Sequence, residues 1–354
     1  MFAQNLNVKR SNTLSRQLKV MEYNLNLSDI SLLNECSDEA LSRFDNVDNP
    51  DFYEAKNIFI TKLPQQIRLT VSEFKKEASD VLVIRGYPFD DKLLGSTPPH
   101  WNVPKSDYAR KLQFINFFIA AQFGYPYSWK TQNGGSFVSD VLPIQGFEEH
   151  QQGYGSNVNL RFHTEDSFHI ARADFLTLMC MRNDSRTPTT LFPIQLDAIP
   201  DEYKRELFKE QYEIYPDDSH TEVTYTEKQY KENTDLQKTF ETFNKIRKIS
   251  ILRGQWNNPY LQLDPEIMPT ENLTTEAKAA FDYICEKIEE SRTGLALNQG
   301  EILIINNHLL AHGRGKFKAN YDGRDRWMER ILVLEDLRKT VSHRTGRNTH
   351  MIVR

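Results

Sequence analysis

From about residue 130 onwards, the chain consists of short β-rich apolar runs that are separated by turn-rich connections. The connections contain Gly and Asn residues, as at 132–135 and 153–155. The runs span residues 137–142, 157–163, 175–181, 190–194, 249–252, 301–306 and 330–334. Many short strands joined by irregular connections are typical of β-sandwiches and jelly rolls. This part of the chain therefore predicts a mainly β fold.

Helices are predicted to flank these strands. Ser106 is a suitable N-cap for an apolar-faced helix that ends at Phe123. A second amphipathic helix is predicted over 274–292. Residues 81–85 (VLVIR) predict a buried strand, and residues 21–60 predict short helices. The expected fold class is mainly β with flanking helices (α+β), with the helices covering one face of the sheet.

The expected organisation is a polar N-terminal arm at 1–20 followed by a single domain at 21–354. Residues 215–246 are highly polar and interrupt the strand pattern. A long excursion of this kind inside a compact domain is often a lid over a site. The alternative, a solvated surface insertion without a role, stays open.

Composition excludes several classes of protein. Hydrophobic residues make up 39% and aromatic residues 11% of the 354, which is enough to bury a core. The net charge of −5 combines both signs, so a basic surface for nucleic acid is not expected. No window approaches the roughly 20 apolar residues of a membrane span, and the N-terminus lacks the apolar core of a signal peptide.

The three cysteines, Cys36, Cys180 and Cys285, are odd in number and widely spaced, and no CxxC motif occurs. This pattern argues against a disulfide framework and a structural zinc site, so each is predicted to be a small buried side chain. A reducing, cytoplasmic location fits this pattern. The oligomeric state stays open, with a homo-oligomer allowed.

The segment with the most chemical information is residues 163–165 (HTE). Side chains at positions i and i+2 of a strand point to the same face, so His163 and Glu165 can present an imidazole and a carboxylate to one point. With a second histidine, this is the 2-His-1-carboxylate triad that holds non-haem iron(II) and leaves coordination positions open. The motif is short, and a structural salt bridge is the ordinary alternative.

A second motif supplies the missing histidine. The run 301–306 leads to His312, and Arg326 follows 14 residues later, before the run 330–334. 2-Oxoglutarate chelates such a metal through its 2-oxo and 1-carboxylate oxygens, and its far carboxylate then needs a fixed counter-ion. Because arginine binds a carboxylate through two parallel hydrogen bonds, Arg326 suits this task.

Other histidines compete for the metal. His169 lies six residues after His163, but a turn after the HTE motif disfavours it. His308 lies four residues before His312 and would be a ligand if the segment were helical. The spacing to Arg326 favours His312. The other five histidines lack supporting spacing and are predicted to lie at the surface: His100, His150, His220, His343 and His350.

With these motifs, the chain resembles the clavaminate synthase-like branch of iron(II)/2-oxoglutarate oxygenases, which includes hydroxylases of free arginine, lysine and asparagine. The resemblance rests on residues 163–165 (HTE), 312–314 (HGR) and 321–327 (YDGRDRW), and extends over about 80–336. It implies a double-stranded β-helix core, which is a distorted jelly roll. It also implies iron(II), 2-oxoglutarate and O₂ as reactants, and hydroxylated amino acid, succinate and CO₂ as products.

The resemblance implies roles for individual residues. The implied metal ligands are His163, Glu165 and His312. Arg326 corresponds to the arginine that binds the 5-carboxylate of 2-oxoglutarate. A threonine that assists 2-oxoglutarate falls near residues 189–190, with Thr190 preferred.

The resemblance also implies a small-molecule partner, a free α-amino acid. Its amine would meet Glu165 and Gln132, and its carboxylate would meet Arg330, for which a structural salt bridge is the alternative. Asp264 lies 48 residues before His312, where arginine hydroxylases carry an acidic residue. A carboxylate aimed at a ligand cation selects strongly for charge, so a basic amino acid is favoured.

Lysine, hydroxylated at C4 or C3, is the first choice of substrate, and arginine is the alternative. The segments that recognise the arginine side chain in this branch tend to carry two aspartates as Asp-x-Asp, whereas this chain has Asp264-Pro265-Glu266. Asp264 capping a turn before Pro265 is a further alternative. The polar insertion offers Asp217, Asp218 and Glu222 as additional partners.

Three other functions stay open. An oxygenase acting on a carrier-bound or other small metabolite would share the same motifs. A zinc hydrolase or a metal-holding binding module also accepts two histidines and a carboxylate, but leaves Arg326 unexplained. A structural β-sandwich without metal is the remaining alternative.

Overall fold

The largest sheet is built from segments that lie far apart in the sequence. In the computed structural model, which describes residues 18–220, 246–344 and 349–353, this main sheet has eight strands. Seven follow the order β1-β2-β13-β6-β15-β3-β16, and β4 also pairs with β15. Their bounds are β1 (Val20–Asn24), β2 (Val81–Arg85), β3 (Tyr125–Trp129), β4 (Ser139–Val141), β6 (Phe175–Arg182), β13 (Ile302–Asn306), β15 (Trp327–Leu334) and β16 (Met351–Ile352).

A smaller sheet, the minor sheet, has the order β12-β7-β14-β5. Its strands are β5 (Leu160–His163), β7 (Thr189–Pro193), β12 (Thr293–Leu295) and β14 (Leu310–Arg314). Leu178 and Met328 of the main sheet share one hydrophobic cluster with Phe162 and Leu191 of the minor sheet. Two sheets that pack around one core form a jelly roll, so the predicted fold class is confirmed.

The central strands of the main sheet are apolar along their length because both faces of the sheet are covered. Val81 and Val83 of β2 face the cluster shared with the minor sheet, whereas Leu82 and Ile84 belong to a second cluster beneath the helices. This alternation follows from the two-residue period of a strand. It explains why VLVIR reads as a continuous apolar run.

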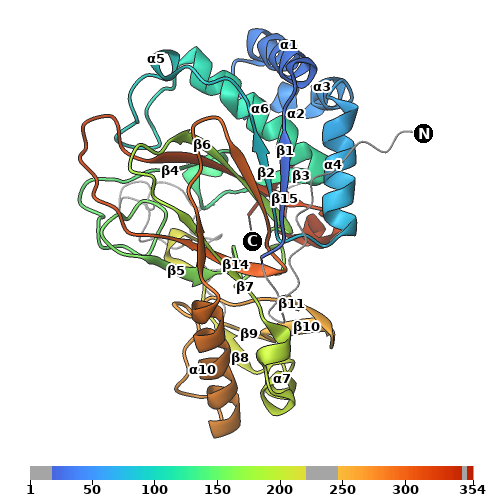
Figure 1. The fold of residues 1–354 in the computed structure, drawn as a ribbon, viewed down its shortest axis with the longest axis vertical. Helices are drawn as coiled ribbons and strands as arrows, with labels where there is room; N and C mark the ends of the chain where they lie inside the picture. The colour runs from blue at the N-terminus through green and yellow to red at the C-terminus, as the bar shows by residue number, and fades with distance from the viewer. Residues whose placement is uncertain (1–17, 221–245, 345–348, 354) are drawn as a thin grey trace.

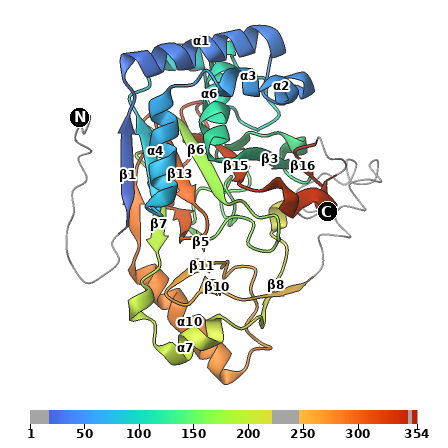
Figure 2. The same cartoon turned by 90° about the vertical axis from the view of Figure 1, so that its right-hand side faces the viewer.

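The helices form two groups at opposite ends of the molecule (Figures 1 and 2). The first group covers the outer face of the main sheet, where α6 contacts β6 and β15. It consists of α1 (Leu27–Phe44), α2 (Pro50–Ala55), α3 (Asn57–Ile60), α4 (Gln65–Lys76), α5 (Asp91–Leu94) and α6 (Asp107–Phe123). The second group is α7 (Asp201–Leu207) and α10 (Thr275–Glu290), near two short ladders: β8 (Tyr212–Ile214) with β9 (Arg247–Ile249), and β10 (Leu252–Gln255) with β11 (Asn258–Leu261).

Both helices predicted in detail are present, with caps that the side chains explain. The Ser106 hydroxyl accepts a hydrogen bond from the N–H of Ala109 at 3.1 Å, which starts α6. The Thr274 hydroxyl accepts the N–H of Ala277 at 3.2 Å, which starts α10. Each cap satisfies a backbone donor that has no partner inside the helix.

The strands differ from the prediction where a distant partner decides the pairing. β1 begins at Val20, inside the predicted polar arm, because it pairs in parallel with β2. The strand predicted at 249–252 is instead the end of β9 and the start of β10. His312 lies inside β14, an unpredicted strand, instead of at the end of the strand at 301–306.

The lid predicted at 215–246 falls mainly on residues 221–245, which lie outside the described residues, so the lid and the single-domain boundary stay predictions. Cys36, Cys180 and Cys285 are buried free thiols, as predicted. Across the described ranges, none of the helices combines the length and apolar character needed to cross a membrane.

β14 and β5 approach each other so closely at Gly313 that a side chain would not fit. A Cβ atom there would lie 2.3 Å from the carbonyl oxygen of Leu160 and 3.1 Å from that of Arg161. The register of the two strands is irregular at the same point, between His312 and Arg314. Any residue larger than glycine would therefore push β5 away from β14.

We predict that Gly313→Ala destabilises the fold by about 1–3 kcal/mol, because the added methyl group must displace the backbone of β5. Gly315→Ala is the matched control, since its Cβ would make ordinary contacts with Pro188 at 3.5 Å. The control should change stability by less than about 1 kcal/mol. Urea unfolding measures both variants, and equal midpoints would contradict the close approach at Gly313.

Candidate active site

A cavity of about 480 Å³ lies between the main sheet and the minor sheet. Its walls come from β5, β6, β7, β14 and β15, and from loops that include residues 131–134 and 151–154. Seven of the eight residues selected from the sequence line it: Gln132, His163, Glu165, Asp264, His312, Arg326 and Arg330. Thr190 is the eighth and does not.

His163, Glu165 and His312 meet at one point of the cavity wall. His163 of β5 is the direct partner of His312 in β14, and their ring centroids lie 4.6 Å apart. Glu165 follows two residues after His163, and its Oε2 lies 3.4 Å from Nε2 of His312. One ligand atom from each residue lies within 4.8 Å of the others, so the three could hold a metal ion.

The surrounding backbone orients these side chains. Nδ1 of His163 donates to the carbonyl oxygen of Arg161 at 2.9 Å, which leaves Nε2 as the nitrogen with a free lone pair. The side chain of Asn307 accepts the N–H of Glu165 at 2.7 Å and donates to its carbonyl at 3.0 Å. Nδ1 of His312 is buried without a hydrogen-bond partner among the described residues.

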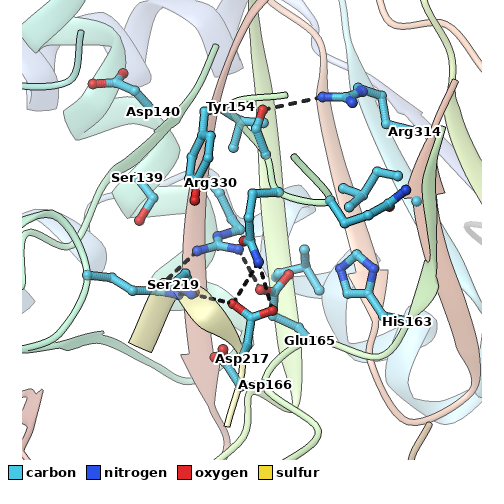
Figure 3. A pocket seen from close by; sticks show the side chains of 18 of the residues that line it. Ser139, Asp140, Tyr154, His163, Glu165, Asp166, Asp217, Ser219, Arg314 and Arg330 are labelled. Carbon is cyan, nitrogen blue, oxygen red and sulfur yellow. Dashed lines mark hydrogen bonds and ion pairs between the residues drawn. The ribbon is translucent and has the colours of Figure 1, made fainter. Parts of the chain in front are cut away.

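Charge keeps Glu165 ionised despite its burial. Burial alone would raise the pKa of its carboxyl group, but Arg330, His312 and His163 together hold that pKa well below its usual range. Figure 3 shows Glu165 and Arg330 pointing toward each other, with His163 beside them. An ionised carboxylate next to two imidazoles is the donor set that iron(II) accepts.

Arg326 is a buried cation that lines the cavity and has no counter-ion among residues 18–220, 246–344 and 349–353. It is 5% exposed, and its Nε lacks a hydrogen-bond partner in the part of the chain that the structure describes. Burial lowers its pKa to about 10, and no described carboxylate offsets this shift. A buried guanidinium in this state favours an anionic ligand.

The preference for Thr190 over Thr189 is reversed by the strand register. Thr189 pairs with Arg314, and Thr190 pairs with Gly313, so Thr189 shares the face of His312 and Thr190 points away. Thr189 lines the cavity, and its hydroxyl is buried without a partner among the described residues. Thr189 is therefore the threonine available to a ligand in the cavity that Arg326 also lines.

Arg330 joins two other candidate residues. Its guanidinium donates to Oε1 of Glu165 at 2.5 Å and to Oε1 of Gln132 at 3.0 Å. The amide nitrogen of Gln132 lies 2.9 Å from Nε2 of His220. The salt bridge that was the alternative for Arg330 is thus present, and it lies within the cavity itself.

His220 corrects the prediction that it lies at the surface. Its side chain is fully buried, and its Nε2 lies 3.1 Å from Oδ1 of Asp166, whose other oxygen accepts the indole N–H of Trp129 at 2.6 Å. Asp166 adopts a positive φ of 48°, which turns the chain sharply after Glu165. No local pattern in the sequence indicates this contact, because 54 residues separate the two partners.

Asp264 also lines the cavity, close enough to His163 for the two charges to interact. Burial raises the pKa of its carboxyl group to about 7, and nearby Asp217 adds to the shift. The Asp217 carboxylate, which also lines the cavity, accepts hydrogen bonds from the amide of Gln152 at 3.0 and 3.1 Å. Asp264 also accepts the N–H of Glu266, so it caps a turn as well as facing the cavity.

Glu266, the acidic residue two positions after Asp264, already has a basic partner. Glu266 pairs with Arg161 at 2.9 Å, with both side chains partly exposed at the rim. The rival histidines are also engaged elsewhere: His169 accepts the N–H of Ala171, and His308 lies 2.6 Å from Asp174. Neither belongs to the cluster around Glu165.

Two residues of the site that were not predicted from the sequence form hydrogen bonds with backbone groups of other segments. Asn307 bonds to the backbone of Glu165, and Arg314 donates to the carbonyls of Gly155 and Val158, which follow the cavity-lining residues 151–154. An asparagine directly after a predicted strand could have indicated the role of Asn307. The contacts of Arg314 could not be predicted, because the fold brings together segments that are more than 150 residues apart.

Comparison with known proteins gives consistent relatives. Enduracididine beta-hydroxylase of Streptomyces hygroscopicus is 33% identical over 94% of this chain and 100% of its own length. L-ornithine/L-arginine 3-hydroxylase of Catenulispora acidiphila is 32% identical over 88% of this chain and 93% of its own. L-lysine 4-hydroxylase of Niastella koreensis is 28% identical over 85% and 80%.

The solved structures agree with these relatives. The crystal structure of the non-heme iron oxygenase OrfP in complex with Fe, succinate and (3S)-hydroxy-L-Arg has a TM-score of 0.87 and 30% identity, and the match covers 94% of this chain and 99% of OrfP. The family model described as "Taurine catabolism dioxygenase TauD, TfdA family" matches residues 113–332. The chain therefore belongs to the TauD/TfdA family of dioxygenases.

Proposed function

We propose that this protein is an iron(II)- and 2-oxoglutarate-dependent hydroxylase that acts on C3 of free L-arginine. The observation that carries the proposal is the charge pattern of the cavity. A cluster that could hold a metal ion lines the same cavity as Arg326, a cation without a counter-ion among the described residues, and the carboxylates of Asp264, Asp217 and Glu266 line it too. The relatives named for enduracididine and for ornithine and arginine favour arginine over lysine. Lysine, preferred from the sequence, becomes the second candidate.

The residues fit the metal that the family uses. His163, Glu165 and His312 would hold iron(II), since one ligand atom from each residue already lies within 4.8 Å of the others and two imidazoles with a carboxylate suit this metal. Bound iron(II) and 2-oxoglutarate supply the oxygen activation that converts a C–H bond into C–OH, with release of succinate and CO₂. The backbone contacts of Arg161 and Asn307 hold the ligands in place for this role.

2-Oxoglutarate would place its 5-carboxylate against Arg326 and Thr189. Both groups are buried, face the cavity and have hydrogen-bonding atoms without described partners. A carboxylate satisfies the guanidinium fork and the hydroxyl together and offsets the cost of burying the cation. This replaces the sequence-based preference for Thr190.

The amino acid would be held by its backbone groups at Arg330, Glu165 and Gln132. Arg330 would pair with the α-carboxylate, and the oxygens of Glu165 and Gln132 that now accept from Arg330 would accept from the amine. A carrier-bound amino acid has no free α-carboxylate for Arg330. The clamp therefore favours a free amino acid.

The guanidinium of arginine would lie between Asp264 and Asp217. A planar fork of five N–H donors can use two carboxylates at once, whereas the lysine ammonium is a compact point charge. Burial raises the pKa of Asp264 to about 7, and such a cation would hold its carboxylate ionised. Glu266 is already paired with Arg161, which leaves Asp217 as the second acid.

The central test is succinate release after anaerobic reconstitution with iron(II) and 2-oxoglutarate, started by O₂, with each free amino acid. We expect arginine to stimulate release most strongly and to gain one oxygen atom at C3, as measured by mass spectrometry and NMR. His312→Ala is the inactive control. Stimulation by lysine alone would reverse the choice of substrate, and no release with any amino acid would overturn the proposal.

We predict that Arg326→Gln raises the KM for 2-oxoglutarate by about 100-fold, because the 5-carboxylate loses a buried charged partner. Arg324→Gln is the matched control, since Arg324 is an exposed arginine that pairs with Asp91 and Asp184 outside the cavity. Its KM for 2-oxoglutarate should stay within about twofold of the wild type. Similar values for the two variants would exclude Arg326 as the carboxylate partner.

We predict that Asp264→Asn lowers kcat/KM for arginine by about 30-fold or more, because a buried charged pair is broken. Turnover of citrulline, the neutral isostere of arginine, should fall much less, so the preference for arginine shrinks. Asp218→Asn is the control, because Asp218 does not line the cavity. An unchanged arginine-to-citrulline ratio in Asp264→Asn would place the guanidinium elsewhere.

A further inference from the structure

Arg172 is a buried arginine that lies outside the cavity, in the loop between Glu165 and β6. It is 2% exposed, and three acceptors surround its guanidinium. It donates to the carbonyl of Leu261 at 2.7 Å, to that of Asn307 at 3.3 Å and to Nδ1 of His308 at 2.9 Å. Burial lowers the pKa of this arginine to about 9. In the part of the chain that the structure describes, these acceptors are all neutral, and burying a cation without a carboxylate partner is costly.

His308 is fixed as an acceptor for Arg172. A guanidinium has only donors, so Nδ1 of His308 must carry the lone pair and Nε2 the proton. That proton is donated to Oδ1 of Asp174 at 2.6 Å. Burial lowers the pKa of His308 to about 4, so the ring stays neutral beside the cation. The Asp174–His308 pair thus orients Arg172.

The hydrogen bond from Arg172 to Asn307 connects it to Glu165, one of the candidate metal ligands. The carbonyl of Asn307 accepts from Arg172, and the side chain of Asn307 holds both backbone polar groups of Glu165. Asn307 is fully buried and also donates to the carbonyl of Ala173 at 2.8 Å. A shift of Arg172 would therefore move the support of Glu165.

The hydrogen bond from Arg172 to Leu261 connects it to the segment of Asp264, the residue proposed to bind the substrate side chain. Leu261 ends β11, three residues before Asp264; its carbonyl accepts from Arg172, and its N–H donates to the carbonyl of His308 at 2.8 Å. Two residues later, Leu263 bonds to Thr164, the residue between the two ligands of the HTE motif. The N–H of Thr164 donates to the carbonyl of Leu263 at 2.8 Å, and the Thr164 hydroxyl accepts the N–H of Leu263 at 3.1 Å.

We propose that Arg172 is a positioning residue that fixes the distance between the metal-binding loop and the substrate-reading segment at Asp264. The proposal rests on the proposed function for the roles of Glu165 and Asp264. A single guanidinium bonds to the supports of both, and Thr164 stitches the two segments together nearer the cavity. That distance decides which C–H bond lies beside the metal and how tightly 2-oxoglutarate consumption is coupled to hydroxylation.

The test compares Arg172→Lys with the wild type. Lysine keeps the charge but lacks the planar fork that reaches both carbonyls. We expect the dissociation constant for Co(II), measured on the apo-protein by absorbance, to rise about 10-fold. The ratio of hydroxylated product to succinate should fall by about twofold or more, because the substrate is misplaced while 2-oxoglutarate still binds.

Arg182→Lys is the matched control for the loss of a buried arginine. Arg182 is 1% exposed and donates to the carbonyls of Gly95 and Gly323 at 2.7 and 2.9 Å, but contacts neither Asn307 nor Leu261. It should lose thermal stability as Arg172→Lys does, with Co(II) affinity unchanged. Should Arg172→Lys fail to fold, Thr164→Val removes the hydroxyl bond to Leu263 with little change of shape, and the product-to-succinate ratio should fall.

The outcomes separate the two proposals. If Arg172→Lys loses stability but keeps wild-type Co(II) affinity and coupling, Arg172 is only structural and the inference is wrong; unchanged coupling in Thr164→Val would overturn it likewise. Co(II) binding needs no amino acid. Absence of arginine turnover by the wild type would therefore count against the proposed function, whereas the Co(II) series would still decide whether Arg172 supports Glu165.

Discussion

The pairing of β5 with β14 is the constraint on which the rest of the site depends. It sets His163 directly opposite His312, and Glu165, two residues after His163, places its Oε2 3.4 Å from Nε2 of His312. The two backbones come close enough only because Gly313 has no side chain. A metal site needs its ligands preorganised, and here the backbone hydrogen-bond ladder between the two strands provides that order.

The cavity also contains buried charged side chains that differ in whether they are paired. Arg326 faces the cavity without a described counter-ion, whereas Arg330 is already paired with Glu165. An unpaired cation is destabilising in a protein interior, so a site of this kind gains stability when an anion enters. Asp264 is the opposite case. Burial raises the pKa of its carboxyl group, so a cation beside it would stabilise the ionised form. The cavity thus has complementary demands for an anionic co-substrate and a cationic substrate.

The predicted elements succeeded where local chemistry decides the conformation. The caps at Ser106 and Thr274, and the apolar runs of β2 and β6, depend on periods and side chains within a few neighbouring residues. β14 and β1 were missed because neither segment is distinctive by itself. Each is a strand because a partner that is distant in the sequence offers it a ladder of hydrogen bonds.

The sequence by itself predicted a mainly β sandwich or jelly roll and selected His163, Glu165, His312 and Arg326 as candidate site residues, because residue type, two-residue spacing and motif order are properties of the chain alone. Only the tertiary structure decided that Thr189 instead of Thr190 faces the cavity, since one step along a strand reverses the side chain and the register is set by β14. Burial of His220 and the reach of Arg172 were likewise decided in three dimensions. Their partners lie 54 to 136 residues away, and no local pattern encodes such contacts.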